Sequence, residues 1–164
     1  MEQIIYFSNV DQSDVSIQSQ VEEYVNKLVD LENVIAPPLC FWIHDFKMAV
    51  EEAEKNNLIS ESLSFNEQLD YFLREYPQYD NDIAYDKEGN IWASRTKVTL
   101  RLDLNNGTSQ IEFFEDQKSI TTDQSVNVSC EDMSFFIYND HCGIWEFHSV
   151  AVYELAITVF LGVI

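Results

Sequence analysis

The chain has 164 residues, with 9 Lys and Arg against 29 Asp and Glu, and its formal net charge is −20. Hydrophobic residues make up 46% of the sequence, while Gly and Pro number only 4 and 3, so there is enough apolar material for one core. This composition excludes a disordered acidic tail, and the negative charge opposes direct binding to nucleic acid or to an anionic membrane.

The sequence pattern contains no internal repeat and no linker, so we expect a single domain over residues 1–164. The first residues lack the basic and apolar stretches of a signal peptide. The most apolar segment, residues 150–164, contains Glu154 and is too short to span a bilayer, so we expect it to be a buried strand or helix. Three cysteines with no framework spacing favour free thiols and a cytoplasmic location.

The N-terminal half predicts mainly helices. Residues 3–7 are expected to form a strand, and apolar side chains recur every three or four positions over residues 13–31, which is the period of a helix. Pro37 and Pro38 predict a break in regular structure, followed by a short strand over residues 39–43.

Two further helices are predicted before the middle of the chain. Asp45 is placed to cap a helix that ends near Lys55. Ser64 and Glu67 have the spacing of a capping box, in which each side chain bonds to the backbone N–H of the other residue. The helix that follows this box is expected to end at Pro77, because proline cannot continue a helix.

The C-terminal half predicts antiparallel strands. Residues 83–92 are typical of a hairpin in which Gly89 occupies a left-handed turn position. Further strands are predicted over residues 126–130, 133–138 and 144–148. The predicted fold class is therefore α+β, with helices mainly in the N-terminal half and an antiparallel sheet built from hairpins in the C-terminal half.

A second hairpin is predicted around Asn106 and Gly107, which suit a two-residue type I′ turn. That turn would place apolar residues opposite each other on one face and opposite charges on the other. The expected pairs are Leu102 with Ile111, Leu100 with Phe113, Arg101 with Glu112, and Lys97 with Asp116.

The acidic excess is larger than solubility requires. Residues 1–82 hold 17 acidic and 4 basic side chains, and residues 83–164 hold 12 and 5. A small domain needs a net charge of only about 2–8 to stay in solution, and a larger one destabilises the fold by self-repulsion. We therefore expect the negative surface to bind a basic protein.

One segment, residues 76–88, alternates tyrosines with carboxylates. Tyrosine is enriched at binding hot spots, and carboxylates steer a basic partner into contact. The alternative is an acidic loop whose tyrosines pack back onto the core. The predicted partner-binding residues are Tyr79, Asp80, Asp82, Tyr85, Asp86 and Glu88, together with Glu51, Glu52 and Glu54 of the preceding helix.

Metal and catalytic sites are less well supported. A calcium loop counted from Asp80 would need Gly at its sixth position and Glu at its twelfth, which are Tyr85 and Ile91. Cys130, His141, Cys142 and His148, with Cys40 or His44, contain no paired zinc motif. We expect no metal, no cofactor and no catalytic residue, although Cys142 with Asp140 and either His148 or His44 would suit a small cysteine-dependent enzyme.

These observations predict an intracellular acidic inhibitor that occludes a basic, nucleic-acid-handling protein. The leading version is an immunity protein of a nuclease-type toxin, as in a toxin–antitoxin pair. The alternative is a phage- or plasmid-encoded DNA mimic with anti-CRISPR or anti-restriction activity. The other classes left open are the cysteine-dependent enzyme and a structural module that uses residues 150–164 as an interface strand.

Overall fold

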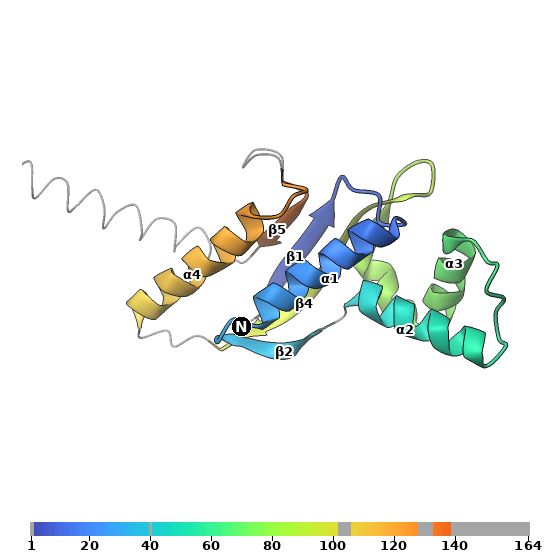
Figure 1. The fold of residues 1–164 in the computed structure, drawn as a ribbon, viewed down its shortest axis with the longest axis horizontal. Coiled ribbons are helices and arrows are strands. Elements are labelled where there is room, and N and C mark those ends of the chain that lie inside the picture. The colour runs from blue at the N-terminus through green and yellow to red at the C-terminus, as the bar shows by residue number, and fades with distance from the viewer. Residues whose placement is uncertain (1, 40, 102–105, 128–132, 139–164) are drawn as a thin grey trace, which may run out of the picture.

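The computed structural model describes residues 2–39, 41–101, 106–127 and 133–138, in which helices combine with an antiparallel sheet (Figure 1). The elements in chain order are β1 (Glu2–Ser8), α1 (Val15–Val29), β2 (Val34–Leu39), α2 (Trp42–Lys55), α3 (Phe65–Glu75), the 3₁₀ helix η1 (Pro77–Asp82), β3 (Ile83–Tyr85), β4 (Ile91–Leu100), α4 (Gly107–Thr122) and β5 (Phe135–Tyr138).

The sheet has the strand order β2-β4-β1-β5, and all of these pairs are antiparallel. Strand β3 also pairs with β4, at the edge that β2 occupies further along. Helix α1 connects β1 to β2 across β4, and α4 connects β4 to β5 across β1. This is the β-α-β-β-α-β arrangement of ferredoxin-like folds, with α2, α3, η1 and β3 inserted before its third strand.

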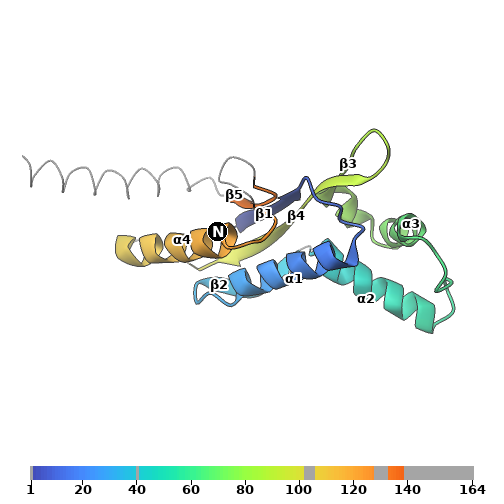
Figure 2. The ribbon, with the colours of Figure 1, turned by 45° about the horizontal axis from the view of Figure 1, so that its top comes forward.

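Helices α1 and α4 cover the same face of the sheet (Figure 2). Side chains alternate along β1, so that Gln3, Ile5 and Phe7 point to one face and are fully buried. The Phe7 ring packs edge-on against Tyr24 of α1, and Gln3 bonds to Gln117 of α4. One face of β1 therefore contacts both helices.

Buried polar groups join these layers. The amides of Gln3 and Gln117 donate to each other, at 2.9 and 2.6 Å. The Tyr24 hydroxyl lies 2.7 Å from the Thr121 hydroxyl and so connects α1 to α4. Burial raises the pKa of Tyr24. Because each of these buried groups has a hydrogen-bond partner, the contact surface between helices and sheet avoids the penalty of an unpaired polar atom.

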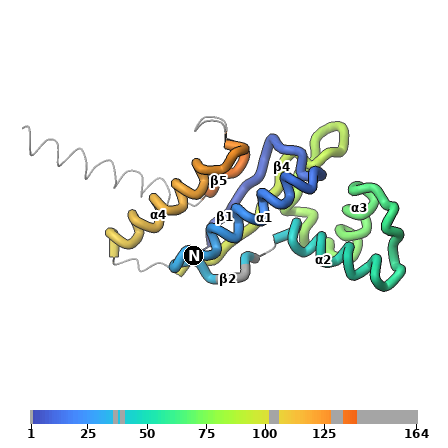
Figure 3. Tube along the Cα trace, viewed as in Figure 1, coloured from blue at the N-terminus to red at the C-terminus, as the bar shows by residue number. Residues whose placement is uncertain are grey.

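The inserted elements α2, α3 and η1, here called the helical arm, contribute a group of aromatic rings to the same hydrophobic core that the sheet and α1 share. The Phe46 ring lies 5.4 Å from that of Phe65 and 5.6 Å from that of Phe72, and Phe72 stacks on Tyr79 at 5.2 Å. The arm lies at the opposite end of the molecule from α4 (Figure 3).

Several sequence predictions are confirmed. The strand over residues 3–7 is β1, the helix over residues 13–31 is α1, and both bonds of the capping box at Ser64 are present. The first hairpin is β3 with β4, and Gly89 in its turn has a φ of 87°. Part of the strand over residues 133–138 is β5.

The prediction for the two prolines is wrong. Pro37 and Pro38 lie inside β2, where the pairing with β4 shifts register between Ile35 and Leu39. An irregular edge strand tolerates residues without an N–H. The chain then enters α2 at Trp42, so residues 39–43 do not form a strand, and Asp45 lies in the first turn of the helix instead of capping it.

The predicted hairpin around Asn106 and Gly107 is also wrong, because Gly107–Thr122 form helix α4. Both edges of β4 are already occupied, one by β1 and the other by β2 and β3. Asn106 instead caps the helix, its side chain accepting from the backbone N–H of Ser109 at 3.2 Å. The expected cross-strand pairs do not form. Their second members lie in helix α4: Ile111, Glu112, Phe113 and Asp116. On β4, Leu100 and Lys97 instead pair with β2.

The division of the chain into halves is only partly correct, since β1 and β2 lie in the first half and α4 in the second. Val126 and Asn127 lie outside any strand. Leu102, the remainder of residues 126–130, and the predicted segments 144–148 and 150–164 fall outside the described residues.

The helical state of residue 107 can be tested by substitution. Gly107 is not in the left-handed region, and an added Cβ there meets nothing within 4 Å. We expect Gly107→Ala to raise the free energy of unfolding by about 0.4–1 kcal/mol in chemical denaturation. The matched variant Gly89→Ala should lower it by about 1 kcal/mol, because φ is positive there. Loss of stability in Gly107→Ala would indicate the turn and contradict the helix.

Candidate protein-binding surface

Tyr79, the first predicted partner-binding tyrosine, is only 8% exposed. Its ring stacks on Phe72 and its hydroxyl donates to the Asp45 carboxylate of α2. The structure therefore places this side chain in the core. This agrees with the alternative prediction, in which the tyrosines of the segment pack onto the core and do not contact a partner. It fixes η1 against α2 and α3.

Asp82 is also buried, at 7% exposure, and its Oδ1 accepts from Nε of Arg95 at 2.8 Å. This bond connects the end of η1 to the central strand β4, and it raises the pKa of the Arg95 guanidinium. A buried carboxylate with a cationic partner holds the fold together and is not available on the surface as a free negative charge.

Asp80 and Tyr85, in contrast, are exposed, and so is Asp70 of α3, the helix against which η1 packs. The pKa of Tyr85 is raised, first because its ring is partly buried and then because Asp80 and Asp70 oppose the charge of a tyrosinate. Three elements, α3, η1 and β3, thus bring two carboxylates and one aromatic ring together. We call Asp70, Asp80 and Tyr85 the acidic surface.

The other two predicted carboxylates of this segment lie in the β3–β4 turn. Asp86 accepts from the backbone N–H groups of Asn90 and Glu88 at 2.8 and 2.9 Å, and these bonds lower its pKa. Asp86 therefore orders the turn, as Asp commonly does. Glu88 is exposed.

Two of the three predicted carboxylates of α2, Glu51 and Glu54, contact other side chains. Glu51 pairs with Lys55 at 2.6 Å, which lowers the pKa of Glu51, and Glu52 is exposed. Glu54 is half-buried and accepts from the Gln68 amide of α3 at 3.5 Å. Glu51 and Glu54 also line a cavity between α1, α2 and α3.

Positive charge is distributed unevenly over the described residues. Lys27, Lys47, Lys55 and Arg74, on α1, α2 and α3, each lie within 4.0 Å of a carboxylate. Residues 91–101, which comprise β4 and the residue after it, contain three cationic side chains and no acidic one, and one of the three, Arg95, is paired with Asp82 of η1. The arm is therefore acidic, whereas β4 is basic.

Sequence reasoning missed Asp70 and the cavity. The only signal for Asp70 is that it falls outside the apolar stripe of its helix, where Leu69 and Phe72 are buried. Nothing in the sequence connects Asp70 to Asp80, because their proximity depends on how η1 returns along α3.

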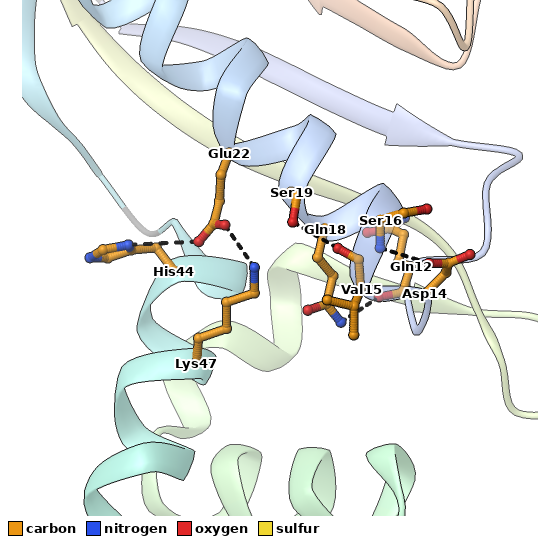
Figure 4. A network of polar contacts seen from close by, with 9 residues as sticks. All are labelled: Gln12, Asp14, Val15, Ser16, Gln18, Ser19, Glu22, His44 and Lys47. Atoms are coloured by element: carbon orange, nitrogen blue, oxygen red, sulfur yellow. Dashed lines mark hydrogen bonds and ion pairs between the residues drawn. The ribbon is translucent and has the colours of Figure 1, made fainter.

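Within the described part of the chain, no group of three or more His, Cys, Asp or Glu side chains is arranged to hold a metal. His44 is exposed, with Nδ1 3.9 Å from Glu22 (Figure 4). The remaining predicted zinc or catalytic residues, Cys40, Cys130, Asp140, His141, Cys142 and His148, lie outside the described residues. No helix among those described is long and apolar enough to cross a bilayer.

Comparison with protein-family models and with curated proteins finds no match to this sequence.

Substitution of two nearby aspartates, the buried Asp82 and the exposed Asp80, tests which of them stabilises the fold. Asp82→Asn should lower the free energy of unfolding by about 1.5–3 kcal/mol, because it weakens a buried bond to a charged group. The exposed Asp80→Asn should change it by less than about 0.5 kcal/mol. Urea denaturation of both variants measures the difference, and equal effects would show that Asp82 does not anchor η1.

The geometry of the acidic surface can be tested through the titration of Tyr85. Replacing Asp70 and Asp80 with asparagine should lower the Tyr85 pKa, because two negative charges that oppose tyrosinate are removed. NMR of the Tyr85 ring resonances against pH reports this shift. The control D123N removes a carboxylate beyond α4 and should leave the Tyr85 pKa unchanged. An unchanged pKa in the double variant would mean that the three residues do not converge.

Proposed function

We propose that this protein is a non-catalytic acidic inhibitor that acts inside the cell, where it binds and occludes a basic, nucleic-acid-handling protein. The observation that carries the proposal is that Asp70, Asp80 and the Tyr85 ring are exposed on three successive elements, α3, η1 and β3, of which η1 packs against the other two. Such a surface combines a negative field with a rigid aromatic contact, which suits a partner rich in Lys and Arg.

The mechanism we propose is steric and electrostatic. Carboxylates of the helical arm attract the basic partner, which speeds association at low ionic strength. Tyr85 then supplies apolar contact area at small entropic cost, because an aromatic side chain has few rotatable bonds. The arm is held by Tyr79 and Asp82, so the docking groups are ordered before binding.

Within this class, an immunity protein of a nuclease-type toxin is the version that we favour, because a single compact patch with an aromatic anchor supports it. A phage- or plasmid-encoded DNA mimic is the second candidate. The observation in its favour is that α4, which lies far from the arm (Figure 1), also carries exposed carboxylates, those of Glu112, Glu115 and Asp116. Partners would then be restriction or CRISPR-type complexes in place of a single nuclease.

Capture from the native lysate at low and high salt tests the proposal. The baits are the wild-type chain, the variant D70N/D80N/E88Q and the α4 variant E112Q/E115Q/D116N, which has the same net charge. We call D70N/D80N/E88Q the arm variant, although Glu88 lies in the β3–β4 turn that follows the arm. We expect the wild type and the α4 variant to retain a basic nuclease or defence complex at low salt. Purified chain should inhibit that protein, and the arm variant should associate with it about tenfold more slowly in stopped-flow mixing.

The outcomes separate the candidates. A nuclease that depends on the arm carboxylates supports the immunity protein, and a defence complex that depends equally on arm and α4 carboxylates supports the DNA mimic. Capture of proteins that are not basic, or of a basic protein whose activity the chain leaves intact, contradicts the proposed function.

A further inference from the structure

A cavity of about 360 Å³ lies between the start of α1, the C-terminal half of α2 and the start of α3. Its apolar lining comes from Phe46, Val50, Phe65 and Val15. We propose that this cavity is a binding site for the side chain of a lysine or arginine of the basic partner. The inference rests on the proposed function, and it assigns the cavity to the same docking event.

The apolar lining suits the stem of such a side chain. Lysine and arginine place their methylene groups along apolar surface and keep the charged end in water. Val15, at the rim, is 70% exposed, so this cavity opens to solvent beside an apolar side chain that the fold leaves uncovered.

The charged groups around the cavity favour a cation. Glu51 and Glu54 line it from α2; Glu51 is already paired with Lys55 at 2.6 Å, whereas Glu54 accepts from the neutral Gln68 amide at 3.5 Å, which does not cancel its charge. Lys47 also contributes to the lining, but its ammonium group extends to Glu22 of α1, at 2.7 Å (Figure 4), so a carboxylate balances its charge. The carboxylates at the cavity therefore attract a bound cation and repel a bound anion.

The helix start near the cavity does not convert it into an anion site. The first turn of α1 carries a partial positive charge, but the Asp14 side chain already accepts from the Ser16 backbone N–H at 2.7 Å. That bond lowers the pKa of Asp14, so the cap is anionic at neutral pH. Polar side chains in the wall are also engaged, since the Gln18 amide donates to the Gln12 carbonyl at 3.0 Å.

The probe for this site is n-butylguanidinium, which has an aliphatic stem and a cationic end. Chemical shifts of the Val15 and Val50 methyl groups should respond to it saturably at constant ionic strength. Guanidinium, which has the charge and no stem, should bind about tenfold more weakly, because it buries no methylene groups. n-Butanol, with the stem alone, should also bind more weakly.

Matched variants locate the cation. E51Q/E54Q should weaken n-butylguanidinium binding about tenfold and leave n-butanol unaffected, because it removes the two carboxylates at the cavity. E112Q/E115Q on α4 makes the same change in net charge and should have no effect. Amide spectra of both variants verify that the fold is retained.

The result that overturns the inference is equal binding of n-butylguanidinium and guanidinium, or equal n-butylguanidinium binding by the wild type and E51Q/E54Q. This failure is distinct from failure of the proposed function. A chain that captures and inhibits a basic protein but lacks the cation site overturns only the inference. A chain that binds n-butylguanidinium in the cavity yet captures no basic protein keeps the site and overturns the proposed function.

Discussion

Full occupancy of the central strand β4 is the constraint on which the rest of the structure depends. One edge pairs with β1 and the other with β2 and β3, so the chain that follows β4 cannot turn back as a neighbouring strand. It instead forms α4, crosses β1 and returns as β5. The helical arm follows β2 and precedes β3, the two strands that share one edge of β4, so both ends of the arm are attached to this central strand.

The attachment of the arm explains why the acidic segment 76–88 forms an ordered surface. Tyr79 fills the aromatic core beside Phe72, and Asp82 bonds to Arg95 on β4. Asp80, between these two anchors, and Tyr85, beyond them, remain exposed, as does Asp70 on the helix that packs against η1. Buried members of the segment thus determine where the exposed members point, and a rigid, preordered patch loses less entropy when a partner docks.

Local signals in the sequence predicted those features that local interactions determine. The apolar period of α1 and the capping box at Ser64 need only residues a few positions apart. Asn106 and Gly107 were ambiguous, because the same pair suits a type I′ turn or the cap and first residue of a helix, and only the occupied edges of β4 decide between them. Composition predicted an acidic surface, but the burial of Tyr79 and Asp82 depends on contacts distant in sequence.

The central claim is that negative potential gathers over the helical arm and is weak over β4. Paramagnetic relaxation of backbone amides by a positively charged nitroxide, compared with a neutral nitroxide of the same size, measures this potential residue by residue. At an ionic strength where screening acts over about 10 Å, the charged probe should be enriched around α2, α3 and η1 and much less enriched around the half of β4 that pairs with β2. Equal enrichment over the arm and β4 would contradict the account.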